Sequence, residues 1–147
     1  MEPSTAARAG LARLYAAFNA KDRAAFDACI AEHPDAFVIG TQRSSTNRAG
    51  WLRNFDDLVA AGADVRLAED DIRAWADGDF AWAVDRPAFL LPGGGRLPTR
   101  LSAVLTRRDG EWRVVHAHFS VAVPDELAVQ QAPAWLEQLG EPAGPGA

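Results

Sequence analysis

Asp85 is the residue of this chain best suited to acid–base chemistry. It lies in a largely apolar run from Phe80 to Leu91, where a carboxylate is unusual. Burial in an apolar cavity disfavours the charged form of a carboxyl group and thereby suits it to proton transfer. We therefore predict Asp85 as the candidate catalytic residue. The alternative is a structural role, either in an ion pair with Arg86, Arg100 or another arginine, or at an exposed position on an edge strand.

Arg100 is the cation that the sequence brings nearest to Asp85. A hairpin that turns at Gly93–Gly95 places Arg100 opposite residues 86–88, within direct or diagonal reach of the carboxylate. One residue of register decides whether the two side chains share a face. In a pocket, Arg100 would stabilise negative charge on a substrate oxygen or keep Asp85 ionised. On the surface it would be an ion-pair partner only, and both alternatives stay open.

The last predicted strand, Glu111–Val121, carries two histidines and a serine at alternate positions. Strict alternation along a strand puts the following side chains on one face: Trp112, Val114, His116, His118 and Ser120. The other face is mostly apolar and carries Arg113, Val115, Ala117, Phe119 and Val121. We expect this apolar face to line the core and a pocket, and the histidine face to lie outside, where a second subunit can cover it. His118 and Phe119 are both candidate ligand-binding residues.

The histidines do not make a convincing metal site. His116 and His118 have a spacing that occurs in metal sites on strands, but zinc or iron needs at least one further protein ligand. His33 is the only other histidine and lies at a distant helix end. The Gly93–Gly95 turn joins two strands and lacks the Lys-Ser or Lys-Thr of a phosphate loop. We therefore predict no metal and no cofactor.

The composition limits the class of protein to which this chain can belong. The chain has 147 residues, 48% hydrophobic and 24% charged, as expected for one globular domain. Its net charge of −5 and the lack of a basic stripe make nucleic acid an unsuitable partner. No apolar run approaches the roughly 18 residues of a membrane span, and the start does not resemble a signal peptide, so we expect a cytoplasmic protein. Cys29 is the single cysteine, which excludes an internal disulfide.

Three helical segments precede the strands. The first has an apolar stripe at helical spacing, formed by Leu11, Leu14, Tyr15 and Phe18. Asp22 can cap a second segment, which His33-Pro34 ends. Thr46 or Asn47 can cap a third, whose apolar face includes Trp51, Leu52, Phe55, Leu58 and Val59. Trp51 and Phe55 lie one turn apart, so we expect them either to pack in the core or to bind a ligand.

A series of hairpins follows. The predicted strands are Val65–Trp75, Phe80–Leu91, Arg96–Arg107 and Glu111–Val121. Strands this long should twist and curl. Residues 125–139 can form a helix that Pro133 interrupts, and the rest should fray. The fold class is α+β: a cone-shaped roll with three N-terminal helices packed on a strongly curved antiparallel sheet. We expect one domain over residues 1–127 and an extension over 128–147.

Four motifs carry a resemblance to a known family: Val38–Thr41, Ala81–Asp85, Arg100–Ser102 and, most specifically, Asp109–Ser120. With the order of elements, they make residues 6–127 resemble the nuclear transport factor 2-like superfamily in its SnoaL-like branch. The resemblance implies a cone-shaped fold, frequent dimerisation and a concave pocket. That superfamily includes isomerases, dehydratases, polyketide cyclases and binding domains, so it implies no single activity.

The last strand also resembles the association domain of calcium/calmodulin-dependent protein kinase, which ends in W-x-x-V-H-x-H-x-S. That domain has a pocket arginine at the position of Phe119, and a second pocket arginine aligns with Asp85. The same cationic pocket is therefore not expected in this chain.

Together these features predict a small-molecule binding protein with a mostly apolar pocket. Trp51, Phe55 and Phe119 would contact an apolar ring or chain. Cofactor-independent isomerase, dehydratase or cyclase chemistry would add proton transfer by Asp85 and charge stabilisation by Arg100. The alternative is a non-catalytic dimerisation or ligand-sensing module. In both cases we expect a homodimer formed through the sheet, with an apolar small molecule as the other partner.

Overall fold

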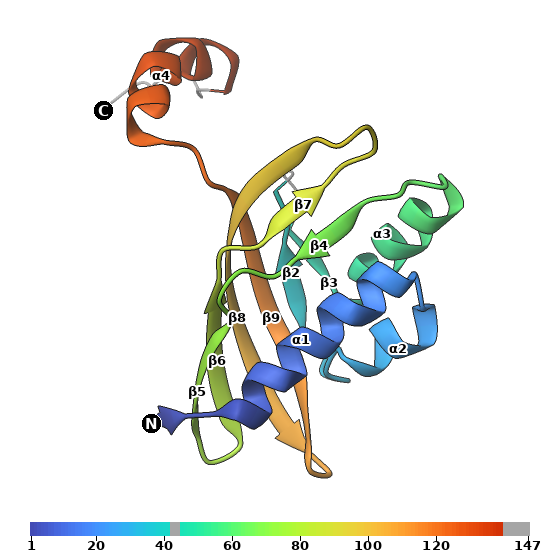
Figure 1. Cartoon of the computed structure of the whole chain (residues 1–147). Helices are drawn as coiled ribbons and strands as arrows, with labels where there is room; N and C mark the ends of the chain where they lie inside the picture. The colour runs from blue at the N-terminus through green and yellow to red at the C-terminus, as the bar shows by residue number, and fades with distance from the viewer. Residues whose placement is uncertain (42–44, 140–147) are drawn as a thin grey trace, which may run out of the picture.

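The computed structural model describes residues 1–41 and 45–139. Its helices are α1 (Thr5–Ala20), α2 (Arg23–Ala28), α3 (Arg48–Ala60) and α4 (Asp125–Leu139). Its strands are β1 (Glu2–Pro3), β2 (Phe37–Ile39), β3 (Ser45–Asn47), β4 (Arg66–Ala68), β5 (Arg73–Asp77), β6 (Phe80–Asp85), β7 (Ala88–Leu90), β8 (Arg96–Arg108) and β9 (Glu111–Val121). Helices α1–α3 lie on one face of a curved sheet, and α4 lies beyond the end of β9 (Figure 1). This is the expected α+β architecture, with three N-terminal helices and, as α4, the helix expected over residues 125–139.

The helix caps follow the sequence signals. The Asp22 carboxylate accepts the backbone N–H of Ala25 at 2.9 Å and caps α2. The Asn47 side chain accepts the N–H of Gly50 at 3.0 Å and caps α3. Helix α4 continues through Pro133, although the sequence suggested an interruption there.

The sheet has the order β1-β5-β6-β8-β9-β2-β3, and β4 and β7 form a separate pair that joins it through β8. All pairs are antiparallel except β2 with β9, which is parallel and was not expected from a series of hairpins. Among the described residues, none of the helices is long and apolar enough to cross a membrane.

Two of the predicted long strands are each broken in two. The first becomes β4 and β5, separated by residues 69–72, and the second becomes β6 and β7, separated by Arg86 and Pro87. The two breaks lie together because β5 pairs with β6 and β4 pairs with β7. The ribbon therefore turns a corner, and β4 and β7 lie near α1 and α3 instead of continuing the main sheet (Figure 1).

A β-bulge in β9 overturns the predicted division of its faces. Val104 pairs with His116 while Leu105 pairs with Val114, so Val115 is an extra residue in the ladder. One extra residue reverses which face the following side chains occupy. As a result Trp112 and Val114 before the bulge and Ala117 and Phe119 after it are all buried on the helix side. The prediction held for Ala117 and Phe119, and it was wrong for Trp112 and Val114.

Helix α1 packs very closely against the sheet. Gly10 faces Trp112, and a Cβ atom added at Gly10 would lie 2.8 Å from the Trp112 Cβ atom. Leu11, the next residue of α1, is fully buried with Leu105 and Val114 in one core cluster. This contact fixes the distance between α1 and the sheet near one end of the helix.

Candidate functional site

An apolar cavity of about 200 Å³ lies between the helices and the concave side of the sheet. Its wall is built from every layer of the fold and consists of Leu14, Phe18, Phe26, Val38, Gly40, Thr41, Trp51, Asn54, Phe55, Leu58, Leu67, Phe89 and Phe119. Thr41 and Asn54 are the polar members and are exposed, which places them toward solvent. No ionisable side chain is among the lining residues that the structure describes.

Six aromatic rings form a connected wall around this cavity. Phe26 and Phe55 stack with their ring centroids 4.4 Å apart, and Trp51 meets Phe26 edge-on at 5.9 Å. Phe18 links this group to Phe89, since its ring lies 6.1 Å from that of Phe55 and 6.5 Å from that of Phe89. Phe89 in turn lies 5.9 Å from Phe119. Because each ring packs against at least one other, the six rings form one continuous aromatic wall.

Helical periodicity explains why these rings converge. Leu14 and Phe18 lie one turn apart on α1, and Trp51, Phe55 and Leu58 lie at i, i+4 and i+7 on α3. The corner in the ribbon supplies the opposite wall, because it brings Leu67 of β4 and Phe89 of β7 to the cavity.

Three of the six predicted site residues line this cavity, namely Trp51, Phe55 and Phe119. Asp85, Arg100 and His118 do not line it. Sequence reasoning missed Phe18, Phe26 and Phe89 as cavity residues. Their apolar spacing was visible for Phe18 and Phe26, but spacing alone does not separate a ring that fills the core from one that borders a space.

The Asp85 carboxylate is buried and fully engaged in hydrogen bonds. Its Oδ1 atom accepts the backbone N–H groups of Arg86 at 2.7 Å, Asp71 at 2.9 Å and Asp70 at 3.3 Å. Its Oδ2 atom accepts the Tyr15 hydroxyl at 3.1 Å. The expectation that Asp85 faces the apolar cavity is therefore wrong. The alternative of an ion pair is also wrong within the described residues, since the partners are three amides and a phenol.

Asp85 lies at the corner of the ribbon, which explains its burial. The N–H groups that it accepts belong to the two breaks between strands, where the ladder no longer provides partners. Thr99 of β8 completes the corner, because both its N–H, at 2.9 Å, and its hydroxyl, at 2.8 Å, donate to the Pro87 carbonyl. Asp85 thus positions the β4–β7 wall of the cavity without touching the cavity itself.

Tyr15 is the side-chain partner of Asp85. Burial raises the pKa of the Tyr15 phenol, and the neighbouring Asp85 carboxylate raises it further. The neutral phenol can donate to the carboxylate, whereas a phenolate would be buried and repelled. Tyr15 therefore serves as a permanent donor.

Arg100 points to the opposite face of β8 from Leu101, the residue that pairs with Asp85, yet Arg100 and Asp85 both line one polar surface hollow, together with Asp70, Asp71, Arg73 and Arg86. Its neighbours Thr99 and Leu101 are buried and Leu101 pairs with Asp85, whereas Arg100 is exposed and donates to the Val123 carbonyl at 3.4 Å. One residue of register thus keeps Arg100 out of the apolar cavity, and no hydrogen bond or ion pair joins Arg100 to Asp85 among the described residues.

The histidines also face outward. The His116 ring lies 4.4 Å from that of Phe37, and its Nδ1 atom lies 3.2 Å from the Phe37 carbonyl oxygen. His118 is exposed in the next outward position. Across residues 1–41 and 45–139, no three His, Cys, Asp or Glu side chains gather closely enough to hold a metal ion.

The sequence that forms the cavity, the corner and the curled sheet matches a known family. A family model for the SnoaL-like domain matches residues 7–124. The chain belongs to the SnoaL-like domain family. No curated protein matches this SnoaL-like chain in sequence.

Solved structures share the fold of this SnoaL-like chain. A nuclear transport factor 2-like protein from Pseudomonas putida is 19% identical with a TM-score of 0.69, over 84% of this chain and 92% of that one. A protein from Thiobacillus denitrificans, provisionally named a calcium/calmodulin-dependent protein kinase type II association domain, is 19% identical with a TM-score of 0.65, over 84% and 98%. A provisionally named dehydratase from Streptomyces avermitilis is 15% identical with a TM-score of 0.67, over 79% and 93%. Identities this low establish a common fold only.

Proposed function

We propose that this SnoaL-like protein binds a small, uncharged, largely apolar molecule in the cavity between α1, α3 and the β4–β7 pair. The observation that carries the proposal is the wall of six aromatic rings without an ionisable side chain among its described members. Apolar burial would drive binding, and a charged ligand would lose its hydration without gaining a charged partner among the described wall residues.

The size of the cavity limits the ligand to about one ring system. A cavity of roughly 150 Å³ holds a benzene-sized molecule, so the 200 Å³ available here suits a substituted single ring or a compact bicycle. Asn54 and Thr41 could orient one hydroxyl or carbonyl group of the ligand toward solvent.

Binding without proton transfer is the version of this function that the geometry favours. Isomerase, dehydratase or cyclase chemistry needs an acid or base within hydrogen-bond reach of the ligand. Asp85, the predicted base, has both its oxygens occupied at the corner of the ribbon. A ligand-sensing or carrier role therefore has more support than the catalytic one.

Thermal unfolding in the presence of three probes tests the proposal. Indole and 4-methylphenol, which are neutral rings of suitable size, should raise the melting temperature of the full chain, whereas benzoate should not. Ligand at 100 times its dissociation constant stabilises the native state by about 2.7 kcal/mol. Equal shifts with benzoate, or no shift with either neutral ring, would overturn the proposal.

A pair of matched variants locates the binding site. Phe55→Leu should weaken binding of indole roughly two- to tenfold, because an aromatic pair contributes about 0.5–1.5 kcal/mol beyond its burial. Trp82→Leu removes an exposed aromatic ring from the opposite face of the sheet and should leave binding unchanged. Isothermal titration of both variants measures the difference, and a loss confined to Trp82→Leu would place the ligand elsewhere.

A further inference from the structure

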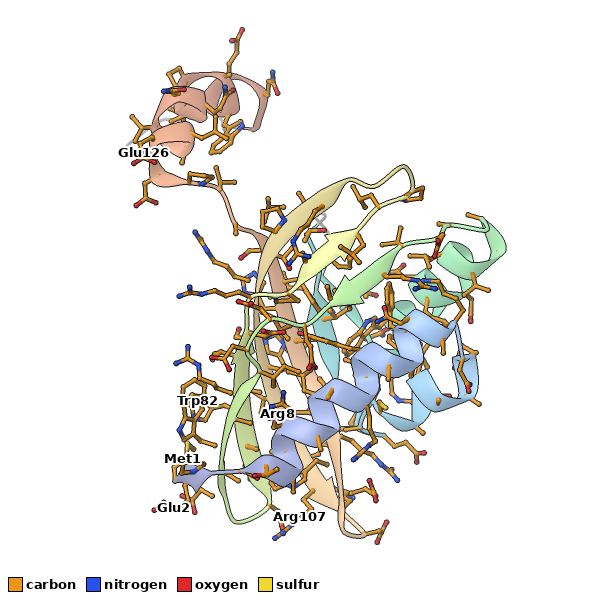
Figure 2. The ribbon with its side chains drawn as sticks, viewed as in Figure 1. Met1, Glu2, Arg8, Trp82, Arg107 and Glu126 are labelled. Atoms are coloured by element: carbon orange, nitrogen blue, oxygen red, sulfur yellow. The ribbon has the colours of Figure 1, made fainter. Side chains whose placement is uncertain are left out.

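Helix α4 has an apolar face that finds no partner among residues 1–41 and 45–139. Its apolar residues recur at helical spacing and are Ala128, Val129, Ala132, Trp135 and Leu136. The helix lies off the rest of the chain, with Glu126 far from the sheet (Figure 2), and Val129 and Leu136 are 74% and 72% exposed. An isolated helix of about 15 residues is marginal in water, and Pro133 removes one of its hydrogen bonds. Helix α4 therefore needs a surface to pack on.

The outer face of the sheet offers a surface of matching character. One row of paired residues crosses five strands and is aromatic or apolar at four of its five positions: Trp75, Trp82, Val104, His116 and Phe37. Trp75 and Trp82 stack with their centroids 4.4 Å apart, and Met1 contacts Trp82 at the edge of the row (Figure 2). Trp82, Phe37 and the nearby Phe80 are exposed. A contiguous exposed patch of this kind is typical of a protein interface.

The charges of the two surfaces are complementary. Helix α4 carries three carboxylates, at Asp125, Glu126 and Glu137, and no lysine or arginine. Arg86 and Arg100 lie at the end of the outer face near the last residues of β9, in a hollow that Asp70, Asp71, Arg73 and Asp85 also line. Asp71 pairs with Arg73 and Asp85 is buried, whereas neither Arg86 nor Arg100 has an ion-pair partner within the described part of the chain. Opposite charges at the edge of an apolar contact favour one register of docking over others.

The dimensions also agree. A 15-residue helix is about 22 Å long, and five neighbouring strands span about 19 Å. Helix α4 could therefore cover the whole aromatic row in one crossing.

The connection between β9 and α4 favours the sheet of a second chain as the surface on which α4 packs. The three-residue segment 122–124 is held against β8, because the Ala122 N–H donates to the Pro98 carbonyl at 3.0 Å and Arg100 donates to the Val123 carbonyl. This directs α4 away from its own sheet (Figure 1).

We propose that α4 packs its apolar face across the aromatic row of a second copy of this chain. In a two-fold dimer the exchange is reciprocal, so each sheet receives the partner's helix. This interface is independent of the ligand proposed for the cavity, which lies on the other face of the sheet.

Sedimentation velocity on full-length variants tests the contact from both sides. Leu136→Glu on α4 and Trp82→Glu on the sheet should each raise the dimer dissociation constant at least about tenfold, because central apolar anchors dominate interface energetics. Leu127→Glu is the matched control, since Leu127 is exposed on α4 but lies off its apolar face. A monomeric wild type, or a dimer lost with Trp82→Glu but unaffected by Leu136→Glu, would overturn the proposal.

Cross-linking distinguishes exchange from packing within one chain. In a Cys29→Ala background, chains with Trp135→Cys are mixed with chains with Trp82→Cys and treated with a short bis-maleimide. Covalent dimers should form in the mixture and not with either variant alone. If the chain carrying both substitutions instead yields only an internally linked monomer, α4 folds back on its own sheet and the proposal is wrong. Circular dichroism of each variant verifies that it folds.

Discussion

At the scale of single residues, Asp85 replaces the backbone partners that two interrupted strands have lost. A buried carboxylate costs several kcal/mol unless hydrogen bonds replace its hydration. Here three amides and one phenol replace it. Asp85 therefore lies in an apolar run because the corner needs a hydrogen-bond acceptor. The sequence around Asp85 alone does not distinguish this structural role from a catalytic one.

Asp85→Ala should destabilise the fold strongly, by about 2–4 kcal/mol, because it leaves several partly buried donors without an acceptor. Asp85→Asn keeps one oxygen for the three amides and should cost only about 1 kcal/mol. Urea denaturation measures both changes. Because Asp85 does not line the cavity, Asp85→Asn should retain the thermal shift with indole. A variant of normal stability that no longer binds indole would show that Asp85 contacts the ligand.

Tyr15 should remain neutral in the folded protein well above the ordinary tyrosine pKa of about 10, because burial and Asp85 raise its pKa. Only the unfolded chain loses the phenol proton near pH 10, so the stability that neutral Tyr15 contributes is fully present below that pH and is lost progressively as pH rises above it. Tyr15 is the sole tyrosine, so absorbance at the phenolate band reports it alone. The phenolate signal should appear together with loss of near-ultraviolet circular dichroism. A transition near pH 10 in folded protein would contradict this, and Tyr15→Phe provides the baseline.

At the scale of elements, periodicity predicts the helices and long strands but not their irregularities. Helices α2 and α3 begin directly after Asp22 and Asn47, as these cap residues indicate. The breaks in the strands and the bulge at Val115 depend on contacts between strands, which no single segment reveals. The bulge has the largest consequence, because it moves Trp112 and Val114 to the face opposite the predicted one.

Gly10→Ala should destabilise the packing of α1 on the sheet. Alanine favours a helix over glycine by about 1 kcal/mol, but the new methyl group would lie 2.8 Å from the Trp112 Cβ atom and 3.1 Å from its carbonyl oxygen. Neither atom can move freely, so overpacking of about 1–3 kcal/mol should exceed the gain. Ala16→Gly at an exposed position of the same helix measures the propensity term alone. If Gly10→Ala stabilises the protein by as much as Ala16→Gly destabilises it, the overpacking has no cost, and α1 can move away from the sheet.

At the scale of the whole molecule, the cavity is a part of the core that the side chains leave unfilled. Trp51, Phe55 and Phe119 could be predicted for its wall because the fold class places α3 and the last strand around a cone. Phe89 could not, because it reaches the cavity only through the corner that Asp85 builds. The unfilled space depends on the sum of all packed volumes, which a sequence pattern does not reveal.

An empty space in a core lowers stability, so filling it should raise stability and abolish binding together. Leu58→Phe adds a ring to the cavity wall and should raise the free energy of unfolding by about 0.5–2 kcal/mol, as cavity-filling substitutions commonly do. The same variant should lose the thermal shift with indole. Val59→Phe, one residue along α3 and outside the cavity wall, should change neither quantity much. Retained indole binding in a stabilised Leu58→Phe variant would mean that the ligand occupies another site, and lower stability would mean that the cavity is already filled by motion of its walls.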